Sequence, residues 1–312
     1  MAIQTMKWLY IIDPFETLDP ETDTTYAMMR ESTRRAIPSY ICTIQDLYFT
    51  NKVAANARKV MFGPNGVILG DTERQPLDDF NLILMRKEPP YDLAFHYATA
   101  LLSLTETPVL NSPEALRSFN EKLVILNFPQ LIPRTLVSAD LQELERFAKD
   151  HHEGVMVKAL DSYQGKMVHK LKRDDVNFDD LLLASTHGGS LPIMLQEYVH
   201  GISEGDKRII LLSGKILGAV KRMPAEGAYI SNLGAGGTGH KTVITAKEHK
   251  LVATIEPFLS KHGIHFAGLD VISEKLTEIN ITCPTGLQHI NRLEGKYLEK
   301  KVVDRFEELA RQ

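Results

Sequence analysis

In the stretch GLDVISEKLTEIN, residues 268–280, two short apolar segments flank a polar turn, which predicts two adjacent β-strands. Side chains alternate along a strand, so Glu278 and Asn280 lie on one face. If a three-residue loop, residues 274–276, joins the strands, Asp270 lies opposite Asn280 on that same face. A two-residue loop would turn Asp270 to the other face, because a shift of one residue inverts every side chain.

In the first of these registers, the hairpin gathers side chains that suit a divalent cation. Two carboxylates and an amide carbonyl, from Asp270, Glu278 and Asn280, are oxygen ligands of the kind that hold Mg²⁺ shared with substrate phosphates. Taken alone, the three residues favour by a small margin a half-exposed hairpin whose polar side chains face water. The basic residues elsewhere in the chain alter that balance.

Four basic residues stand where they could meet a phosphate chain. Lys158 ends an apolar strand, Lys122 follows a predicted helix, and Arg208 and Arg222 stand near the two ends of a predicted hairpin. Each alone is most often a solvated surface charge. Together with a carboxylate cluster, they are what a nucleoside triphosphate requires, because lysine and arginine neutralise the charge that builds up during phosphoryl transfer.

A glycine-rich segment, NLGAGGTG at residues 232–239, could bring backbone N–H groups close to a phosphate or an oxyanion. Its glycine content fits a flexible surface loop at least as well. A P-loop is excluded, because His240 separates the last glycine from Lys241. No G-x-G-x-x-G motif follows the first predicted strand, which disfavours a classical dinucleotide-binding fold.

The composition limits the class of protein. The 312 residues include 36 basic and 40 acidic side chains, for a net charge of −4, with 43% apolar and 24% charged residues. This balance is typical of a globular protein and excludes a disordered chain, a collagen and a coiled-coil rod. We expect no nucleic-acid partner, because there is no overall basic field. Two cysteines indicate a reduced, cytoplasmic setting, and the absence of a long apolar run excludes a membrane helix.

The order of the predicted elements changes along the chain. Strands and helices alternate over roughly the first 110 residues, which predicts an α/β region with a parallel sheet, and an α+β region follows. Three parts are expected: 1–119, an N-terminal substrate domain; 120–199, a central lid; and 200–312, a C-terminal part with the nucleotide site. The predicted strands cover residues 8–12, 39–44, 81–86, 155–158, 193–199, 208–212, 215–220, 268–273 and 276–282, and the predicted helices 24–35, 113–120, 138–150 and 246–259.

Several motifs occur together in a familiar order. They are Met85-Arg86-Lys87-Glu88-Pro89-Pro90, Asn120-Glu121-Lys122, Gly268-Leu269-Asp270 and Thr277-Glu278-Ile279-Asn280. With them the chain resembles the bacterial glutathione synthetases, which are ATP-grasp ligases. The resemblance implies an ATP-grasp fold behind an N-terminal parallel-sheet domain. It also implies an ATP-dependent carboxylate–amine ligase that joins γ-glutamylcysteine to glycine through an acyl phosphate, releasing ADP and phosphate.

The resemblance also implies roles for individual positions. The positions on ATP are Lys122, Lys158, Gln196, Glu197, Tyr198, Val199, Asp206, Lys207, Arg208 and Asn280. The Mg²⁺ ligands, with Mn²⁺ as an alternative ion, are Asp270, Glu278 and Asn280. The catalytic positions near the transferred phosphoryl group and the acyl intermediate are Arg208, Arg222, Gly236 and Gly237, and those that hold the dipeptide substrate are Arg86, Thr24, Thr25 and Asn232. The family further implies a symmetric homo-oligomer, a dimer or a tetramer.

Three departures from the family pattern keep two other functions open. The lid loop at residues 161–166 has a single glycine, and Ile230 and Gln288 stand where the family places arginines. Losing two bidentate partners should weaken the binding of a small carboxylate acceptor, so a ligase with another acceptor or donor is one alternative. A nucleotide-binding protein without catalysis is the other, and the complete set of Arg222, Asp270, Glu278 and Asn280 argues against it.

Overall fold

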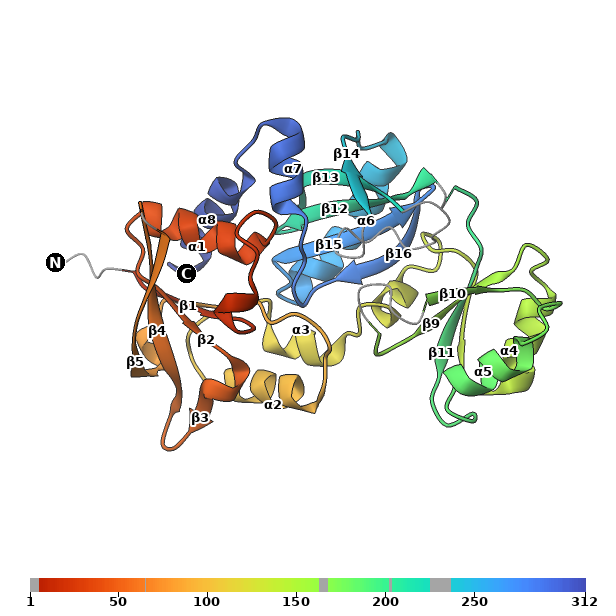
Figure 1. Ribbon diagram of the computed structural model, residues 1–312, viewed down its shortest axis with the longest axis horizontal. Helices are drawn as coiled ribbons and strands as arrows, with labels where there is room; N and C mark the ends of the chain where they lie inside the picture. Colours follow the sequence, from red (N-terminus) through yellow and green to blue (C-terminus); the bar gives the residue numbers. More distant parts are fainter. Residues whose placement is uncertain (1–5, 65, 163–167, 202–203, 225–236) are drawn as a thin grey trace.

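The computed structural model describes residues 6–64, 66–162, 168–201, 204–224 and 237–312. Three β-sheets follow one another along the long axis of the molecule (Figure 1). In the described part of the chain, no helix combines the length and the apolar character needed to cross a bilayer. Short 3₁₀ helices occur at Phe15–Thr17 (η1), Ile44–Asp46 (η2), Leu77–Asp79 (η3) and Leu123–Asn127 (η4).

The N-terminal sheet is parallel only in its centre. Its order is β3-β4-β2-β1-β6-β7, with β5 paired to β4. The strands β2, β1, β6 and β7 are parallel, as predicted, whereas β3, β4 and β5 pair antiparallel. The expectation of a parallel sheet is therefore wrong for this edge. The strands are β1 (Trp8–Ile11), β2 (Ser39–Cys42), β3 (Leu47–Phe49), β4 (Val53–Gly63), β5 (Gly66–Pro76), β6 (Leu82–Met85) and β7 (Val109–Leu110).

Three helices accompany this sheet, and side chains at their N-termini set where they begin. They are α1 (Thr24–Arg34), α2 (Leu93–Leu102) and α3 (Pro113–Ser118). Asp23 caps α1 by accepting a 2.6 Å hydrogen bond from the backbone of Tyr26. Ser112 caps α3 with proline at the first helical position, which confirms the predicted start; the helix ends at Ser118 rather than at residue 120.

The part of the chain expected to act as a lid, called the lid below, is an antiparallel sheet with its own core. Its order is β10-β9-β11-β8, and the predicted strands at 155–158 and 193–199 are present, although the second ends at Glu197. Both helices of the lid pack on the sheet through a separate apolar cluster that includes Leu144, Phe178 and Leu195. The elements are β8 (Thr135–Ser138), α4 (Leu141–Lys149), β9 (Val155–Ala159), β10 (Val168–Leu171), α5 (Phe178–Ser185) and β11 (Ile193–Glu197).

The C-terminal sheet, of order β14-β13-β12-β15-β16, is antiparallel throughout. The predicted hairpin turns at Ser213 and Gly214, whose φ angles of 46° and 76° are those of a tight two-residue turn. The predicted capping box of Thr245 and Glu248 opens α6. The elements are β12 (Asp206–Leu212), β13 (Lys215–Met223), β14 (Thr238–His240), α6 (Ala246–Lys261), β15 (Phe266–Ile272), β16 (Lys275–Asn280), α7 (Leu287–Glu294) and α8 (Leu298–Leu309).

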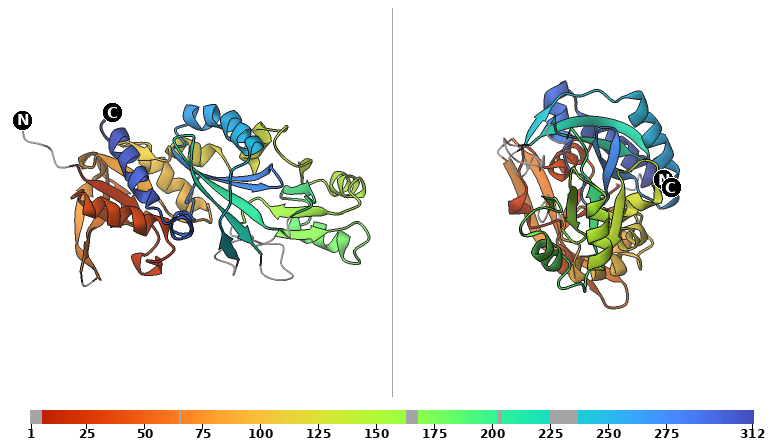
Figure 2. Two further views of the ribbon diagram at one scale, coloured as in Figure 1. Left: turned by 90° about the horizontal axis from the view of Figure 1, so that it is seen from above. Right: turned by 90° about the vertical axis from the view of Figure 1, so that its right-hand side faces the viewer.

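The last helix returns to the first part of the chain. Helix α8 lies against α1, and its Phe306 ring is 6.4 Å from the ring of Trp8 in β1 (Figure 2). The same apolar cluster includes Ile210 and Val220, so α7 and α8 join the N-terminal and C-terminal sheets. The boundary proposed at residue 200 groups α8 with the C-terminal sheet, but part of its packing is with the N-terminal domain.

Candidate active site

The turn between β15 and β16 differs from the predicted one. It consists of two residues, Ser273 and Glu274, both in the left-handed region with φ angles of 46° and 63°. The predicted three-residue loop is therefore wrong. A two-residue turn alone would place Asp270 on the face opposite to Glu278 and Asn280.

A β-bulge reverses that effect. Val271 pairs with Leu276, but Asp270 pairs with Glu278, so that Thr277 is the extra residue on β16. The bulge returns Asp270 to the face that carries Glu278 and Asn280. The register prediction that Asp270 lies opposite Asn280 is wrong, because Asn280 pairs with Gly268. The shared face is nevertheless present, and the Asn280 amide nitrogen lies 3.4 Å from Asp270 Oδ2.

A buried network of two arginines and two aspartates lies on this face. Arg208 donates two hydrogen bonds to Asp270, from Nε at 2.5 Å and from Nη2 at 2.9 Å. Arg222 Nη2 lies 3.0 Å from the same carboxylate, and its Nε donates to Asp206 at 2.7 Å. Arg208, Arg222 and Asp270 are 7%, 5% and 6% exposed. The two arginines stand near the two chain ends of the β12–β13 hairpin, as predicted, and these ends lie side by side at its open end.

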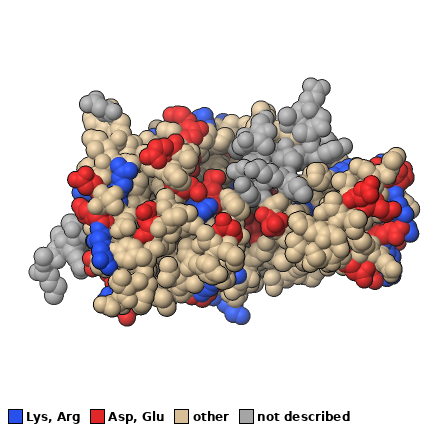
Figure 3. Space-filling view, turned by 60° about the horizontal axis from the view of Figure 1, so that its bottom comes forward, with Lys and Arg blue, Asp and Glu red and all other residues tan. Residues whose placement is uncertain are grey.

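The network keeps Asp270 ionised. Burial by itself would raise the pKa of this carboxyl, but Arg208 and Arg222 more than offset burial and hold its pKa well below the usual range. A buried carboxylate paired in this way is an anionic group fixed in position. Figure 3 shows acidic and basic side chains close together in the hollow at the middle of one face of the molecule.

Two glycines make room for this network. A Cβ atom on Gly268 would lie 3.0 Å from Cδ of Arg208, so the missing side chain lets Arg208 reach across β15 to Asp270. Gly205, directly before Asp206, has φ of +89°, and a Cβ there would lie 2.2 Å from the Arg222 carbonyl oxygen. A larger residue at either position would displace one of the arginines or its strand.

The two lysines expected on phosphates approach the same strands from the lid side. Lys158, on β9, donates to the Gln196 side-chain oxygen at 2.6 Å and lies 3.5 Å from the Thr277 carbonyl oxygen. Lys122 lies 3.5 Å from Glu278 Oε1 and donates to the Ser162 carbonyl oxygen. Burial lowers the pKa of Lys158 to about 8, although the Glu278 charge opposes this effect.

The other predicted nucleotide residues divide into two groups. Lys207 is not brought to this face: it points to the other side of β12, where Nζ lies 2.7 Å from Glu248. Gln196 and Glu197 are the last two residues of β11, and Tyr198 and Val199 begin the connection that leads to β12. The backbone N–H of Tyr198 donates to the Gly154 carbonyl at 3.1 Å.

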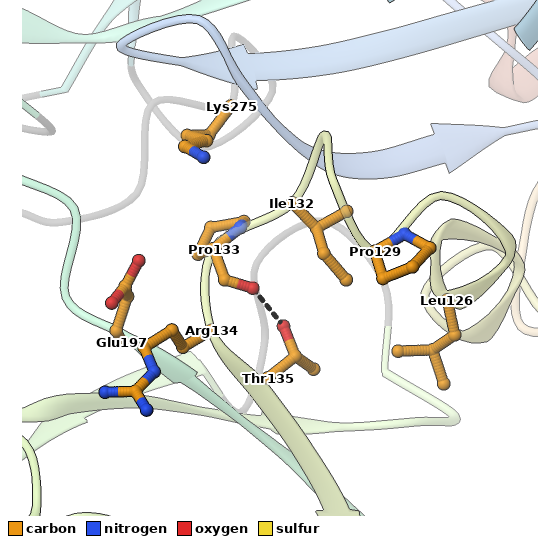
Figure 4. Close-up of a pocket in the computed structure, with 8 residues that line it drawn as sticks. All are labelled: Leu126, Pro129, Ile132, Pro133, Arg134, Thr135, Glu197 and Lys275. Atoms are coloured by element: carbon orange, nitrogen blue, oxygen red, sulfur yellow. Dashed lines mark hydrogen bonds between the residues drawn. The ribbon is translucent and has the colours of Figure 1, made fainter. Parts of the chain in front are cut away.

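A cleft of about 380 Å³ lies beside this connection (Figure 4). It touches the predicted nucleotide positions through Glu197 alone. Its lining does not include Lys122, Lys158 or Asp270, so it is separate from the charged face. The lining residues are Leu126, Pro129, Ile132, Pro133, Arg134, Thr135, Glu197 and Lys275.

The side chains predicted to hold the dipeptide substrate lie at the junction with the N-terminal domain. Arg86 donates to the Thr25 hydroxyl at 2.9 Å and to the Pro284 carbonyl at 3.0 Å. The hydroxyl of Thr24 accepts a hydrogen bond from the backbone of Leu287 at 3.4 Å. The predicted loop residues Asn232 and Gly236, together with Ile230, lie outside the described residues, and Gly237 is the first residue described after that gap.

Sequence reasoning missed one residue on this face. Glu121 belongs to the motif Asn120-Glu121-Lys122, but only the lysine was assigned a role. Its carboxylate bonds to residues 281 and 282, directly beyond Asn280. In the sequence, Glu121 is marked only by its position next to Lys122. That position does not indicate that its carboxylate binds residues 281 and 282.

Comparison with known proteins gives consistent matches over nearly the whole chain. The model of the prokaryotic glutathione synthetase N-terminal domain matches residues 6–117, and that of the prokaryotic glutathione synthetase ATP-grasp domain matches residues 121–295. A glutathione synthetase of Prochlorococcus marinus subsp. pastoris is 37% identical over 308 residues, covering 97% of this chain and 100% of that protein. One from Bradyrhizobium diazoefficiens is 36% identical over 303 residues, covering 95% and 96%.

Solved structures confirm the fold. The D-cycloserine synthetase DcsG matches with a TM-score of 0.66 at 14% identity, covering 96% of this chain and 99% of that one. The ATP-grasp ligase PsnB, complexed with a precursor peptide and AMPPNP, matches with a TM-score of 0.63 at 15% identity, covering 99% of both chains. These matches confirm the expected ATP-grasp architecture. With both family models matched and relatives similar over their full length, the chain belongs to the prokaryotic glutathione synthetase family.

Proposed function

We propose that this protein is an ADP-forming ligase that joins the carboxylate of γ-glutamylcysteine to the amine of glycine at the expense of ATP. The observation that carries the proposal is the buried network of Arg208, Arg222 and Asp270, faced by Lys122 and Lys158 from the lid. Fixed guanidinium and ammonium groups around one face suit a polyanionic substrate whose charge shifts during the reaction.

The oxygen donors on this face fit Mg²⁺. Asp270, Glu278 and Asn280 share one face and offer two carboxylates and an amide, the donor set expected for Mg²⁺ that is shared with substrate phosphates. In this structure Arg208 and Arg222 bond to the Asp270 carboxylate, and the Asn280 amide faces it with its nitrogen. Among the described residues, no group of three or more His, Cys, Asp or Glu side chains is placed to hold a metal ion. When bound, such an ion would be held by Asp270, Glu278 and Asn280 and would act as a Lewis acid toward the substrate phosphates.

The residues of the chain then account for both chemical steps. Lys122 and Lys158 hold the phosphate chain, so that a carboxylate oxygen of the dipeptide can bond to the γ-phosphorus as ADP leaves. The amine nitrogen of glycine next bonds to the acyl carbon, phosphate leaves with that oxygen, and the amine loses a proton. Arg208 and Arg222 neutralise the transferred phosphoryl group and the oxyanion. Catalysis is by positioning and charge, without a covalent nucleophile.

A cysteine nucleophile is not needed for these steps, and Cys283 is poorly suited to be one. Its thiol donates to the Arg86 carbonyl oxygen at 3.1 Å. Burial raises its pKa to about 12, so that almost none of it is thiolate at neutral pH.

One contact favours a second candidate function, a ligase of the same chemistry with another acceptor or donor. The Gln288 side-chain nitrogen donates to the carbonyl oxygens of Pro20 at 3.1 Å and Asp23 at 2.5 Å. This amide is therefore committed to the loop before α1. A family arginine at this position would supply a positive charge for a carboxylate, whereas a neutral amide occupied by two carbonyls does not.

The test is the release of ADP and phosphate by purified protein with ATP, Mg²⁺, γ-glutamylcysteine and glycine. We expect turnover with this pair and formation of the tripeptide, identified by mass spectrometry. If ADP is released only with another amine, then that amine, and not glycine, is the acceptor. Bound ATP without turnover across a panel of donors and amines would contradict the ligase function.

We also propose a cytoplasmic location and a symmetric homo-oligomer, a dimer or a tetramer. Both cysteines, Cys42 and Cys283, are unpaired, which suits a reducing compartment. The oligomer rests on the family resemblance alone. Light scattering after size-exclusion chromatography measures the mass directly, and a monomer at micromolar concentration would contradict that part of the proposal.

A further inference from the structure

Residues 121–131 run along the free edge of β16, the strand that carries Glu278 and Asn280. On its other edge β16 pairs with β15. On its free edge β16 bonds to residues 121–131. The backbone N–H of Leu276 donates to the Leu131 carbonyl at 2.9 Å, and that of Ile279 donates to the Glu121 carbonyl at 3.1 Å. Residues 121–131 thus take the place of a neighbouring strand along the free edge of β16.

The Glu121 carboxylate fixes the chain directly beyond this strand. Its Oε1 accepts hydrogen bonds from the backbone N–H of Ile281 at 2.6 Å, the backbone N–H of Thr282 at 2.8 Å and the Thr282 hydroxyl at 2.9 Å. β16 ends at Asn280, so these N–H groups lie past its last ladder residue. Asn111 donates to the carbonyl oxygen of Ile281 at 2.7 Å. The residue after Asn280 is therefore held at both its N–H and its carbonyl.

The neighbours of Glu121 connect the same point to the lid. The Asn120 side chain donates to the Leu160 carbonyl at 2.8 Å, just after β9, and accepts from the backbone N–H of Lys122 at 3.0 Å. Lys122 then extends to Glu278, 3.5 Å away. Asn120 therefore bonds to the chain just after β9, and Glu121 bonds to the chain just after β16. Lys122, the next residue, is held between these two attachments and Glu278.

We propose that Glu121 is a positioning residue for the nucleotide and its metal ion: by anchoring residues 281 and 282, it sets Asn280 and Lys122 at the spacing that a Mg²⁺–nucleotide complex requires. The inference rests on the proposed function only for the identity of that ligand. Glu121 acts through its neighbours, because its carboxylate bonds to residues 281 and 282. Partners of this kind, one step removed from the ligands, typically change metal affinity by about 10- to 100-fold when removed.

The test compares Glu121→Ala, Glu121→Gln and a matched control, Glu299→Gln. Glu299 is a buried carboxylate, 5% exposed, which accepts a 2.6 Å hydrogen bond from Asn291 in the α7–α8 region away from the site. For each variant, calorimetry gives the Kd for Mg²⁺–ADP, thermal unfolding gives the Tm, and steady-state kinetics separate the KM for ATP from kcat. Binding of Mg²⁺–ADP needs no amino-acid substrate, so it is independent of the acceptor and donor.

We expect Glu121→Ala to raise the Kd at least about tenfold, and Glu121→Gln, which keeps an acceptor oxygen, to recover most of that loss. Glu299→Gln should lower the Tm without changing the Kd. If Glu121→Ala does not fold, Thr282→Val removes a single hydrogen bond of the anchor and should raise the Kd severalfold. A Kd equal to that of the wild type in the folded Glu121 and Thr282 variants, with only the Tm lowered, would overturn the inference. A wild type that binds Mg²⁺–ADP but forms no tripeptide would overturn only the proposed function.

Discussion

The unusual titration of Lys158 gives a direct test of its role. Its ammonium group lies against Gln196 and the Thr277 carbonyl, and burial lowers its pKa from the ordinary 10.5 to about 8. This difference corresponds to roughly 3 kcal/mol. A bound phosphate would favour the charged form and restore part of that free energy. Nucleotide binding should therefore take up a proton at mildly alkaline pH.

The magnitude follows from the fraction of Lys158 that is protonated before the nucleotide binds. With a pKa of about 8, that fraction is about nine-tenths at pH 7, half at pH 8 and one-tenth at pH 9. The apparent Kd is the intrinsic Kd divided by the competent fraction, so it should rise about tenfold from pH 7 to pH 9. The phosphates of ADP contribute little to this change, because a phosphate monoester is already fully ionised above about pH 7.

The assay is calorimetric titration with Mg²⁺–ADP at pH 7, 8 and 9, in buffers of different ionisation enthalpy so that proton uptake is counted directly. Lys158→Arg is the matched control, because a guanidinium stays charged over this range. Its Kd should vary little with pH, and its binding should take up no proton. A wild-type Kd that is constant from pH 7 to pH 9, or an equal slope in Lys158→Arg, would refute the assignment of Lys158 to a phosphate.

Three further substitutions probe the charged face. Asp270→Asn should abolish ADP release and, by leaving the buried Arg208 guanidinium without its carboxylate, lower the free energy of unfolding by about 3–5 kcal/mol in denaturant titrations. Gly268→Ala places a Cβ 3.0 Å from Cδ of Arg208; we expect kcat to fall while the Tm changes little, and a normal kcat would show that Arg208 tolerates the shift. Lys207→Met should lower stability by about 3 kcal/mol, because Glu248 loses its partner, yet leave the Kd for Mg²⁺–ADP unchanged; a weakened Kd would return Lys207 to the nucleotide site.

Local signals in the sequence predict elements and caps well. The capping box at Thr245, the start of α3 after Ser112 and the turn at Ser213 and Gly214 each depend on residues a few positions apart. The long hairpin of β4 and β5 was not predicted, because burial along residues 53–63 does not alternate strictly: three buried residues open β4, and its pairing with β5 shifts register between Arg58 and Val60. Its absence from the prediction is why the edge of the N-terminal sheet was expected to be parallel.

Other features of the site depend on geometry that sequence patterns do not contain. The turn at Ser273 and Glu274 lacks the Asn-Gly or Gly that two-residue turns favour, so its residues did not favour a two-residue loop over a three-residue one. No residue pattern near Thr277 indicated the β-bulge there either. Two errors in the predicted register therefore cancelled, and the shared face of Asp270 and Glu278 was inferred correctly from an incorrect pairing.

The alternation of side chains along a strand, which located this face, also shows which neighbouring residues point to the opposite face of the sheet. On β12, Asp206 and Arg208 point to one side and Lys207 to the other, so the period of two would have removed Lys207 from the nucleotide residues had it been applied there.

No such rule identifies Glu121, because its partners are 160 residues away and the residue acts only through the fold. A carboxylate that binds backbone N–H groups leaves no pattern in a single sequence, since any backbone presents the same groups. What sequence can predict are the ligands, which need particular chemistry. What holds those ligands in place must be taken from the structure.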